Sequence, residues 1–338
     1  MQDRANLEGV PRLVTGSRPA LGAYDADIVI LAFNRVRETE IAIASALSQR
    51  GGSFHVTVLD QGSAPEATAA LVTRFRGAGN FSFYCLAQNS GVPAGRNLVT
   101  GLGHGEIIIS LDNDAEFDNP WVAMNAVKKL RREPDIAVMA FAILLPDKIS
   151  IDSASWGYPA RLVDRHKTAF DTTTFVGAGH AIRRSAWIAA GGYDPELFFT
   201  WEEYDFSLRA IALGWRIRYD GFLTVIHHKP ACTKLCWEAE RIMYFTRNRL
   251  LIERKWGKPL WRLVPRMVGY LVQSLMLGSA PAGWVGIIRA CRTPIRQQHK
   301  MSAQGRAYLL AHDKIYRGSW LHQLRSGGMR THLVAEPR

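Results

Sequence analysis

Cysteine is scarce in this sequence, with only four among 338 residues. So few cysteines, unevenly spaced, do not make a disulfide framework, which indicates a reducing compartment such as the cytoplasm. The alternative use of two of them is a zinc site with His227, His228, Cys232 and Cys236. Structural zinc sites usually contain Cys-x2-Cys pairs, which this spacing does not provide, so we do not favour a zinc site.

Long, uninterrupted apolar runs are also missing. Residues 1–23 are polar and lack the apolar segment of a signal peptide, so secretion is not expected. Residues 267–288 are uncharged and long enough to span a membrane, but glycines and Pro281 interrupt them, which predicts two shorter helices meeting near residues 278–281. Arginines flank this stretch, which suits a position on an anionic lipid surface; a helical hairpin packed on the protein body is the alternative.

Acidic residues are rare in the last third of the chain. Residues 230–338 contain 19 basic and 5 acidic residues, whereas residues 1–229 contain 23 and 25. The formal net charge of +12 therefore belongs to the C-terminal part. This split favours a near-neutral catalytic unit with a basic docking extension over a uniformly basic nucleic-acid binder.

Apolar runs alternate with helix-like segments in the first half. The patterns predict strands at 26–33, 54–60, 81–86 and 106–111, and helices at 38–48, 64–76 and 93–101. This alternation predicts an α/β fold with a mostly parallel sheet, flanking helices, and ligands at the carboxyl ends of the strands. The first strand is followed by neither a dinucleotide-binding glycine motif nor a P-loop, so hydride transfer and ATPase chemistry are not favoured.

A series of eight motifs resembles glycosyltransferase family 2, inverting enzymes of the GT-A fold that use nucleotide-sugar donors. Rhamnosyltransferase-like members are the most similar. The motifs are ILAFNR (30–35), VLDQGS (58–63), NSGVPAGRN (89–97), SLDNDAEF (110–117), GAGHAIRRSAWIAAGGYDPELFF (177–199), WEEYDFSLRAIALGW (201–215), IHH (226–228) and YFTRNRLL (244–251). Their order along the chain, more than any single motif, carries the resemblance.

The resemblance implies a division of the chain. A GT-A domain is expected at 24–256, with a nucleotide-sugar-binding half (24–116) and an acceptor-binding half (117–256). An N-terminal extension (1–23) and a basic, partly apolar helical region (257–338) would flank it.

The motif Asp112–Asn113–Asp114 follows the fourth predicted strand. Its two acids lie on the same side of an extended segment, and hard carboxylate oxygens suit Mg2+ or Mn2+, which neutralises charge on a leaving nucleoside diphosphate. The resemblance implies that Asp114 is the direct metal ligand and Asp112 a more indirect one, with Asn113 near the donor. His227 would complete the coordination. The alternative is a solvated acidic turn.

The resemblance also places donor-binding residues at the strand ends. Asp60 resembles the aspartate that hydrogen-bonds a uracil- or thymine-type base, although an Asp before Gly62 also suits a simple turn. The segment Ala32–Phe33–Asn34 would line the nucleotide, where many relatives have Thr-Tyr. The further expected donor contacts are Arg35, Asn89, Gly91, Arg96 and Arg247.

Two of these residues keep alternatives. Arg96 could support the diphosphate or pair with an acid of the protein body. Arg247 and the adjacent Asn248 and Arg249 could bind the diphosphate or fix an active-site lid, and the sequence does not decide between these roles.

Inverting transfer needs a carboxylate base that takes a proton from the acceptor hydroxyl. The resemblance places Glu203 at the base position, where most relatives have Asp, and Glu202 is the second candidate. Asp205 and Arg209 stand four residues apart on the following predicted helix, which indicates a structural ion pair.

Together these features predict a metal-dependent inverting hexosyltransferase that moves a sugar from a UDP- or dTDP-sugar to a hydroxyl acceptor, in glycan, glycolipid or glycosylated-metabolite biosynthesis. The expected cofactor is a divalent cation, Mg2+ or Mn2+. The acceptor would be a glycan, lipid-linked or small molecule, and the location cytoplasmic, peripheral on the inner face of the cell membrane. Nucleic acid is not expected as a partner, and a homodimer stays open. The alternative is a non-catalytic GT-A-like module that docks on an anionic membrane or nucleic acid through its basic C-terminal region.

Overall fold

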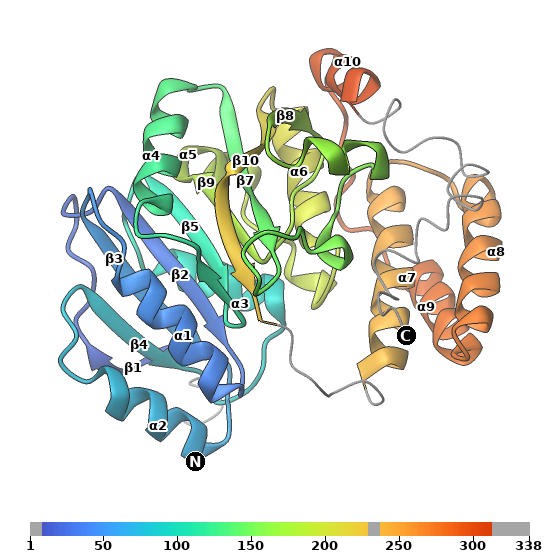
Figure 1. Cartoon of the computed structure of the whole chain (residues 1–338). Helices are drawn as coiled ribbons and strands as arrows, with labels where there is room; N and C mark the ends of the chain where they lie inside the picture. Colours follow the sequence, from blue (N-terminus) through green and yellow to red (C-terminus); the bar gives the residue numbers. More distant parts are fainter. Residues whose placement is uncertain (1–8, 229–236, 313–338) are drawn as a thin grey trace.

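The computed structural model describes residues 9–228 and 237–312. A ten-stranded mixed sheet forms the centre of the protein (Figure 1). The strand order is β1-β4-β3-β2-β5-β9-β7-β10-β6, and β8 pairs with β10 beside this path. The strands are β1 Arg12–Gly16, β2 Ala26–Ala32, β3 Phe54–Asp60, β4 Phe81–Cys85, β5 Ile107–Asp112, β6 Ala115–Phe117, β7 Ile136–Leu144, β8 Ala169–Thr172, β9 Gly179–Arg183 and β10 Arg216–His227.

The first six helices cover both faces of this sheet, and four more helices follow in the C-terminal part of the described residues. They are α1 Val36–Leu47, α2 Pro65–Phe75, α3 Val92–Gly101, α4 Val122–Arg132, α5 Arg184–Ala190, α6 Glu202–Ala212, α7 Trp237–Lys255, α8 Leu260–Met276, α9 Ala280–Arg292 and α10 Ala303–His312. Three short 3-10 turns, η1 Ser153–Ser155, η2 Ala160–Arg165 and η3 Pro195–Leu197, lie in the connections.

The predicted α/β class and mostly parallel arrangement are confirmed. Strands β4, β3, β2 and β5 pair in parallel, as do β7 and β10, and these six strands share one direction. Strand β9 runs antiparallel between β5 and β7, which sequence alternation alone did not indicate. Strand β1, from the predicted N-terminal extension, pairs antiparallel with β4 and forms an edge of the sheet.

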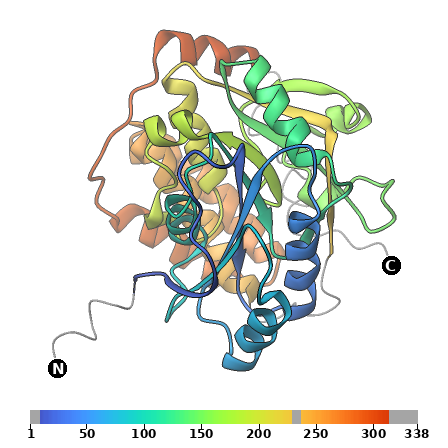
Figure 2. The same cartoon turned by 90° about the vertical axis from the view of Figure 1, so that its left-hand side faces the viewer.

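Alternate residues of each central strand face different helical layers. In β2, Ile28 and Ile30 pack in the core beneath α1, α2 and α4, whereas Val29 and Leu31 pack with α3, α5 and α6. Side chains of a strand alternate between the two faces of a sheet, so a strand covered on both faces is apolar along its whole length. Figure 2, which looks from the β1 side, shows the two layers on opposite sides of the sheet.

The C-terminal helices pack on one another and on the body. Helices α8 and α9 meet at residues 277–279, so the two shorter helices predicted for this stretch are confirmed. Arg254 of α7 donates to the carbonyl oxygen of Thr293 (2.8 Å), and Tyr308 of α10 donates to that of Thr172 in the sheet (2.9 Å). Within residues 9–228 and 237–312, no helix is both long and apolar enough to cross a membrane.

Candidate active site

Loops at the carboxyl ends of β2, β3 and β4 are joined by side-chain hydrogen bonds. The backbone N–H of Asn34 donates to Ser63 Oγ (2.7 Å), and the hydroxyl of Ser90 donates to Gln61 Oε1 (2.8 Å). Both Asn34 and Arg35 have left-handed backbone conformations, with φ of 55° and 53°, which turn the chain sharply from β2 into α1. The structure therefore brings together the strand ends at which the sequence placed donor-binding residues.

Asp60 is fully buried at the end of β3. Its Oδ1 accepts a hydrogen bond from the N–H of Ser63 (2.8 Å), and its Oδ2 accepts one from the hydroxyl of Thr68 (2.7 Å). These two hydrogen bonds are the ones expected of an aspartate that stabilises a turn, the alternative role of Asp60. Each carboxylate oxygen can accept more than one hydrogen bond, so the nucleobase contact stays a prediction.

Other residues predicted to contact the donor shape the same loops. Ala32 is buried, Phe33 is half-buried, and the amide of Asn113 donates to Thr39 Oγ1 (3.2 Å). Asn89 Oδ1 accepts from the N–H of Gly91 (2.8 Å). Gly91 has a φ of 83°, and a Cβ there would lie 2.5 Å from the carbonyl oxygen of Phe198, so this position requires glycine.

Arg96 lies inside the protein and holds Asp112. Its side chain is 4% exposed, forms an ion pair with Asp112, and donates to the carbonyl oxygens of Val29 (3.2 Å) and Leu111 (3.3 Å). Of the two alternatives for Arg96, the structure therefore places it against an acid of the body. Enclosure by the protein raises the pKa of Asp112 even though its side chain is partly exposed, and Arg96 opposes this rise.

Asp114 lies between two cationic side chains. Its Oδ2 pairs with the guanidinium of Arg35, and its Oδ1 lies 3.5 Å from His227 Nε2. Burial alone would raise the pKa of Asp114, but His227 and Arg35 outweigh burial and lower it. The carboxylate is thus charged and oriented by residues from β10 and from the β2–α1 turn.

His227 is fixed by a second carboxylate that sequence patterns did not identify. Its Nδ1 lies 2.9 Å from Oδ2 of Asp152, which also accepts from the hydroxyl of Ser155 (2.7 Å). Burial lowers the pKa of His227, but its hydrogen bonds to Asp114 and Asp152 outweigh burial and raise it to about 9. Such a partner on Nδ1 orients the ring so that Nε2 faces Asp114.

The donor set at Asp112, Asp114 and His227 fits a divalent cation chemically. It offers hard carboxylate oxygens and one imidazole nitrogen, which are ligands for Mg2+ and Mn2+. Ligation needs neutral imidazole, and a cation at Asp114 would favour that form. In the described parts of the chain, no three His, Cys, Asp or Glu side chains are arranged as a metal-binding group, so ligation by all three residues stays a prediction. Cys232 and Cys236 of the alternative zinc site lie outside the described residues.

Glu202 and Glu203 are the first two residues of helix α6. Glu202 is 4% exposed, its Oε2 has no hydrogen-bond partner among the described residues, and burial raises its pKa to about 7. Glu203 is half-buried, and desolvation together with the charge of Glu202 raises its pKa well above the usual range. The charge of Asp112 contributes to both shifts, which places the glutamate pair close to the Asp-x-Asp motif.

A conformationally strained segment leads into the glutamate pair. Phe198, Thr200 and Trp201 all have positive φ, between 60° and 72°. The amide of Asn248, on α7, donates to the carbonyl oxygens of Leu197 (2.8 Å), Phe199 (2.7 Å) and Thr200 (3.1 Å). Strained backbone persists only where surrounding contacts hold it, and the hydrogen bonds of Asn248 provide such contacts; whether this segment acts as an active-site lid stays a prediction.

The neighbours of Asn248 support the same segment. Arg247 is half-buried and donates from Nη1 to the carbonyl oxygen of Glu196 (2.9 Å). The guanidinium of Arg249 lies 4.2 Å from the centroid of the Tyr204 ring. The predicted ion pair between Asp205 and Arg209 is confirmed at 2.8 Å.

The chain is similar in sequence to one protein family and to one protein of a known organism. Residues 27–189 match the family model described as Glycosyl transferase family 2. An uncharacterized protein of Haemophilus influenzae is 25% identical over 174 residues, which cover 48% of this chain and 90% of that protein.

Two solved structures have a similar fold. The mannosyltransferase PcManGT from Pyrobaculum calidifontis, in complex with GDP-Man and Mn2+, superposes with a TM-score of 0.56 at 14% identity, covering 92% of this chain and 85% of its own. Residues 1–349 of S. aureus TarS superpose with a TM-score of 0.50 at 16% identity, covering 68% and 64% of the two chains. The predicted GT-A fold is thereby confirmed.

Proposed function

Because this chain carries a glycosyltransferase family 2 domain with the GT-A fold, we propose that it is a metal-dependent inverting transferase that moves a hexosyl group from a UDP- or dTDP-sugar to a hydroxyl acceptor. The observation that carries the proposal is the electrostatic coupling of the Glu202–Glu203 pair to Asp112. Such coupling supports a site in which the base candidates lie near the Asp-x-Asp motif, as does Gly177 beside Glu203, since the next residue, Ala178, accepts a hydrogen bond from the N–H of Asp112 (3.1 Å). Titratable groups with perturbed pKa values near one another are typical of catalytic centres.

Each side chain has a role in this reaction. Glu203, which keeps part of its surface open, takes the proton of the acceptor hydroxyl as that oxygen attacks the anomeric carbon opposite the leaving diphosphate, which inverts the configuration. Gly177 keeps space free beside it, since a Cβ there would lie 2.4 Å from Glu203 Oε1. Arg96 orients Asp112, and His227 with Arg35 orients Asp114. A divalent cation held by these residues would neutralise charge on the leaving diphosphate.

The test is a donor panel. We expect the purified protein to bind UDP or dTDP more tightly than CDP or ADP in the presence of Mn2+ or Mg2+, measured by calorimetry, because Asp60 suits a base with a ring N–H donor, which cytosine and adenine lack. We also expect slow hydrolysis of the matching sugar donor, with water as acceptor, that stops with EDTA. Absence of nucleoside diphosphate binding under every metal condition would contradict the proposal and favour the non-catalytic binding module.

We further propose that α8 docks on an anionic membrane surface, with the enzyme peripheral to it. Trp261, Val264, Val268, Val272 and Leu275 recur every three or four residues, so they share one face of α8, and each is 47–68% exposed. An apolar helix face of this kind with nearby arginines is typical of helices that lie in the lipid interface.

The double variant Trp261→Gln, Val268→Gln tests this docking. Burial of two large apolar side chains contributes about 1.5–3 kcal/mol each, so we expect the variant to lose at least about tenfold in partitioning to phosphatidylglycerol vesicles, measured by co-sedimentation. Ile188→Gln, at another exposed apolar residue on α5, is the control. Point variants are preferable to removal of the residues after Trp256, because α8 and α9 pack on α7 and Tyr308 of α10 donates a hydrogen bond to the sheet. Equal partitioning of the double variant and the wild type would argue against docking through α8.

A further inference from the structure

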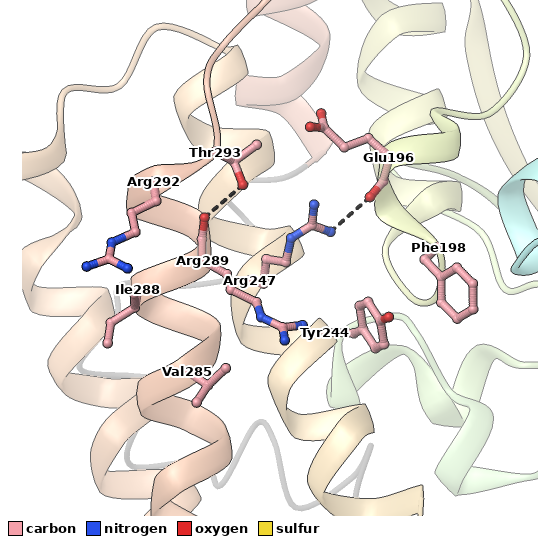
Figure 3. Close-up of a pocket in the computed structure, with 9 residues that line it drawn as sticks. All are labelled: Glu196, Phe198, Tyr244, Arg247, Val285, Ile288, Arg289, Arg292 and Thr293. Carbon is pink, nitrogen blue, oxygen red and sulfur yellow. Dashed lines mark hydrogen bonds between the residues drawn. The ribbon is translucent and has the colours of Figure 1, made fainter.

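A cavity of about 600 Å³ lies between η3, α7 and α9 (Figure 3). Helix α7 contributes Tyr244 and Arg247, helix α9 contributes Ile288 and Arg289, and Phe198 follows η3. In the close-up, the guanidinium of Arg289 points toward Tyr244, and that of Arg247 points toward the carbonyl oxygen of Glu196. The cavity is separate from the carboxylates of the Asp-x-Asp motif, none of which lines it.

The cavity has an excess of positive charge. Arg247 donates only from Nη1 in the bonds that the structure describes, to the carbonyl oxygen of Glu196 and to Asn248 Oδ1, both at 2.9 Å. Arg289 contacts Met243 Sδ at 3.6 Å. Neither guanidinium forms an ion pair with a carboxylate of residues 9–228 or 237–312. The Glu196 carboxylate shares Lys255 Nζ (2.7 Å) with Asp194, which leaves one negative charge against the three arginines of the lining.

Two guanidinium groups that line one pocket suit a phosphate. Guanidinium offers a planar fork of N–H donors that matches phosphate oxygens, and charge-assisted bonds of this kind are stronger than neutral ones. A third arginine, Arg292, lies one turn beyond Arg289 at the border of the cavity. Each bond that a phosphate accepts here would satisfy an N–H group without having to break an existing ion pair.

The rest of the lining is apolar. The rings of Phe198 and Tyr244 are stacked, with centroids 5.3 Å apart and planes at 23°, and Val285 and Ile288 line the α9 side. Val285 and its neighbour Trp284 are 38% and 54% exposed, so the apolar lining continues onto the outer surface of α9. A ligand for this cavity therefore combines a phosphate with an apolar chain that extends along α9.

The cavity is connected to the proposed base by one short segment. Phe198 precedes Glu202 by four residues, and its carbonyl oxygen accepts from the N–H of Val92 at the start of α3 (2.8 Å). Asn248, adjacent to Arg247, holds the carbonyl oxygens of the residues on either side of Phe198. The wall of the cavity and the glutamate pair are thus positioned by the same contacts.

We propose, on the basis of the function proposed above, that this cavity binds the phosphate of a lipid-phosphate-linked acceptor. The phosphate anchors the molecule while a hydroxyl of the carried glycan reaches Glu203. The hydroxyl oxygen forms the new bond to the anomeric carbon, its proton passes to Glu203, and the bond to the diphosphate breaks with the electron pair leaving on the diphosphate oxygen.

Binding of geranyl phosphate, measured by calorimetry with UDP and Mn2+ present at saturation, tests the assignment. We expect Arg289→Ala to weaken binding at least about tenfold, since a charge-assisted hydrogen bond is lost, and Arg289→Lys to weaken it less. Arg262→Ala removes the same charge from α8 outside the cavity and should change the affinity less than twofold. UDP affinity should be equal in all these variants.

Several outcomes would overturn the assignment: an unchanged affinity in Arg289→Ala, displacement of geranyl phosphate by UDP, or geraniol binding as tightly as geranyl phosphate. Inorganic phosphate binding as tightly as geranyl phosphate would exclude the lipid part. Failure of the protein to bind UDP would instead count against the proposed function, and geranyl phosphate binding without UDP that depends on Arg289 would still support the cavity as a lipid-phosphate site.

Discussion

Replacing Glu203 with Gln should lower kcat by about 10²–10⁴-fold, the usual contribution of a positioned general base. Gln has nearly the same shape but cannot accept the proton of the acceptor hydroxyl. The substitution also removes a carboxyl whose pKa is raised by burial and by Glu202, so folding should not suffer. The measurement is donor turnover by the purified variant, with sugar transfer to water or to an acceptor found by screening.

Glu202→Gln is the matched control. Glu202 is 4% exposed, so it is less accessible to an acceptor than Glu203. We therefore expect the Glu202→Gln variant to keep kcat within about tenfold of the wild type. The reverse order, with a large loss in Glu202→Gln and a small one in Glu203→Gln, would assign the base to Glu202. Small losses in both would remove the base role from this pair.

The pH profile provides a second readout for Glu203. A base acts only when deprotonated, and the pKa of Glu203 lies well above the usual range for Glu. The kcat/KM of the wild type should therefore be low at acidic pH and rise as pH increases through that raised pKa. This acidic limb should be absent from the residual activity of Glu203→Gln, and an unchanged limb would assign the titration to another group.

Sequence patterns predicted well those features that depend on local order. Strands β2, β3 and β4 are mostly apolar because they are buried on both faces, and their ends are marked by polar turn residues such as Asn34, Asp60 and Asn89. Strand β9 was not predicted. Its antiparallel insertion between β5 and β7 depends on long-range pairing, such as Ala181 beside Ile109, which leaves no local periodicity.

The features that the sequence did not predict depend on contacts between distant segments. Asp152 faces His227 across 75 positions of sequence, and Asn248 reaches carbonyl oxygens about 50 residues earlier. No spacing rule connects such residues. Arg96 illustrates the same limit, because its type suits either a diphosphate or a buried acid, and only the fold shows its guanidinium against Asp112 and the carbonyl oxygen of Leu111.

Asp114→Asn should lower the affinity for Mn2+ in the presence of UDP by at least about 100-fold, since even residues that only support a metal ligand contribute 10- to 100-fold. The amide keeps the size of the carboxylate but loses its charge and one hard oxygen. It also loses the ion pair with Arg35, while the Asp152–His227 contact should persist. Turnover should fall in parallel, because the leaving diphosphate would no longer be neutralised.

Asp118→Asn is the control for this variant. Asp118 lies four residues further along the chain, accepts a hydrogen bond from the hydroxyl of Thr224 (3.0 Å), and an Asn there can still accept it. The same substitution thus changes net charge equally without touching the Asp-x-Asp motif. Mn2+ titration by electron paramagnetic resonance separates the two variants directly. Equal Mn2+ affinity in Asp114→Asn and Asp118→Asn would show that the charge of Asp114 does not contribute to Mn2+ binding. Asp114 would then not be a metal ligand.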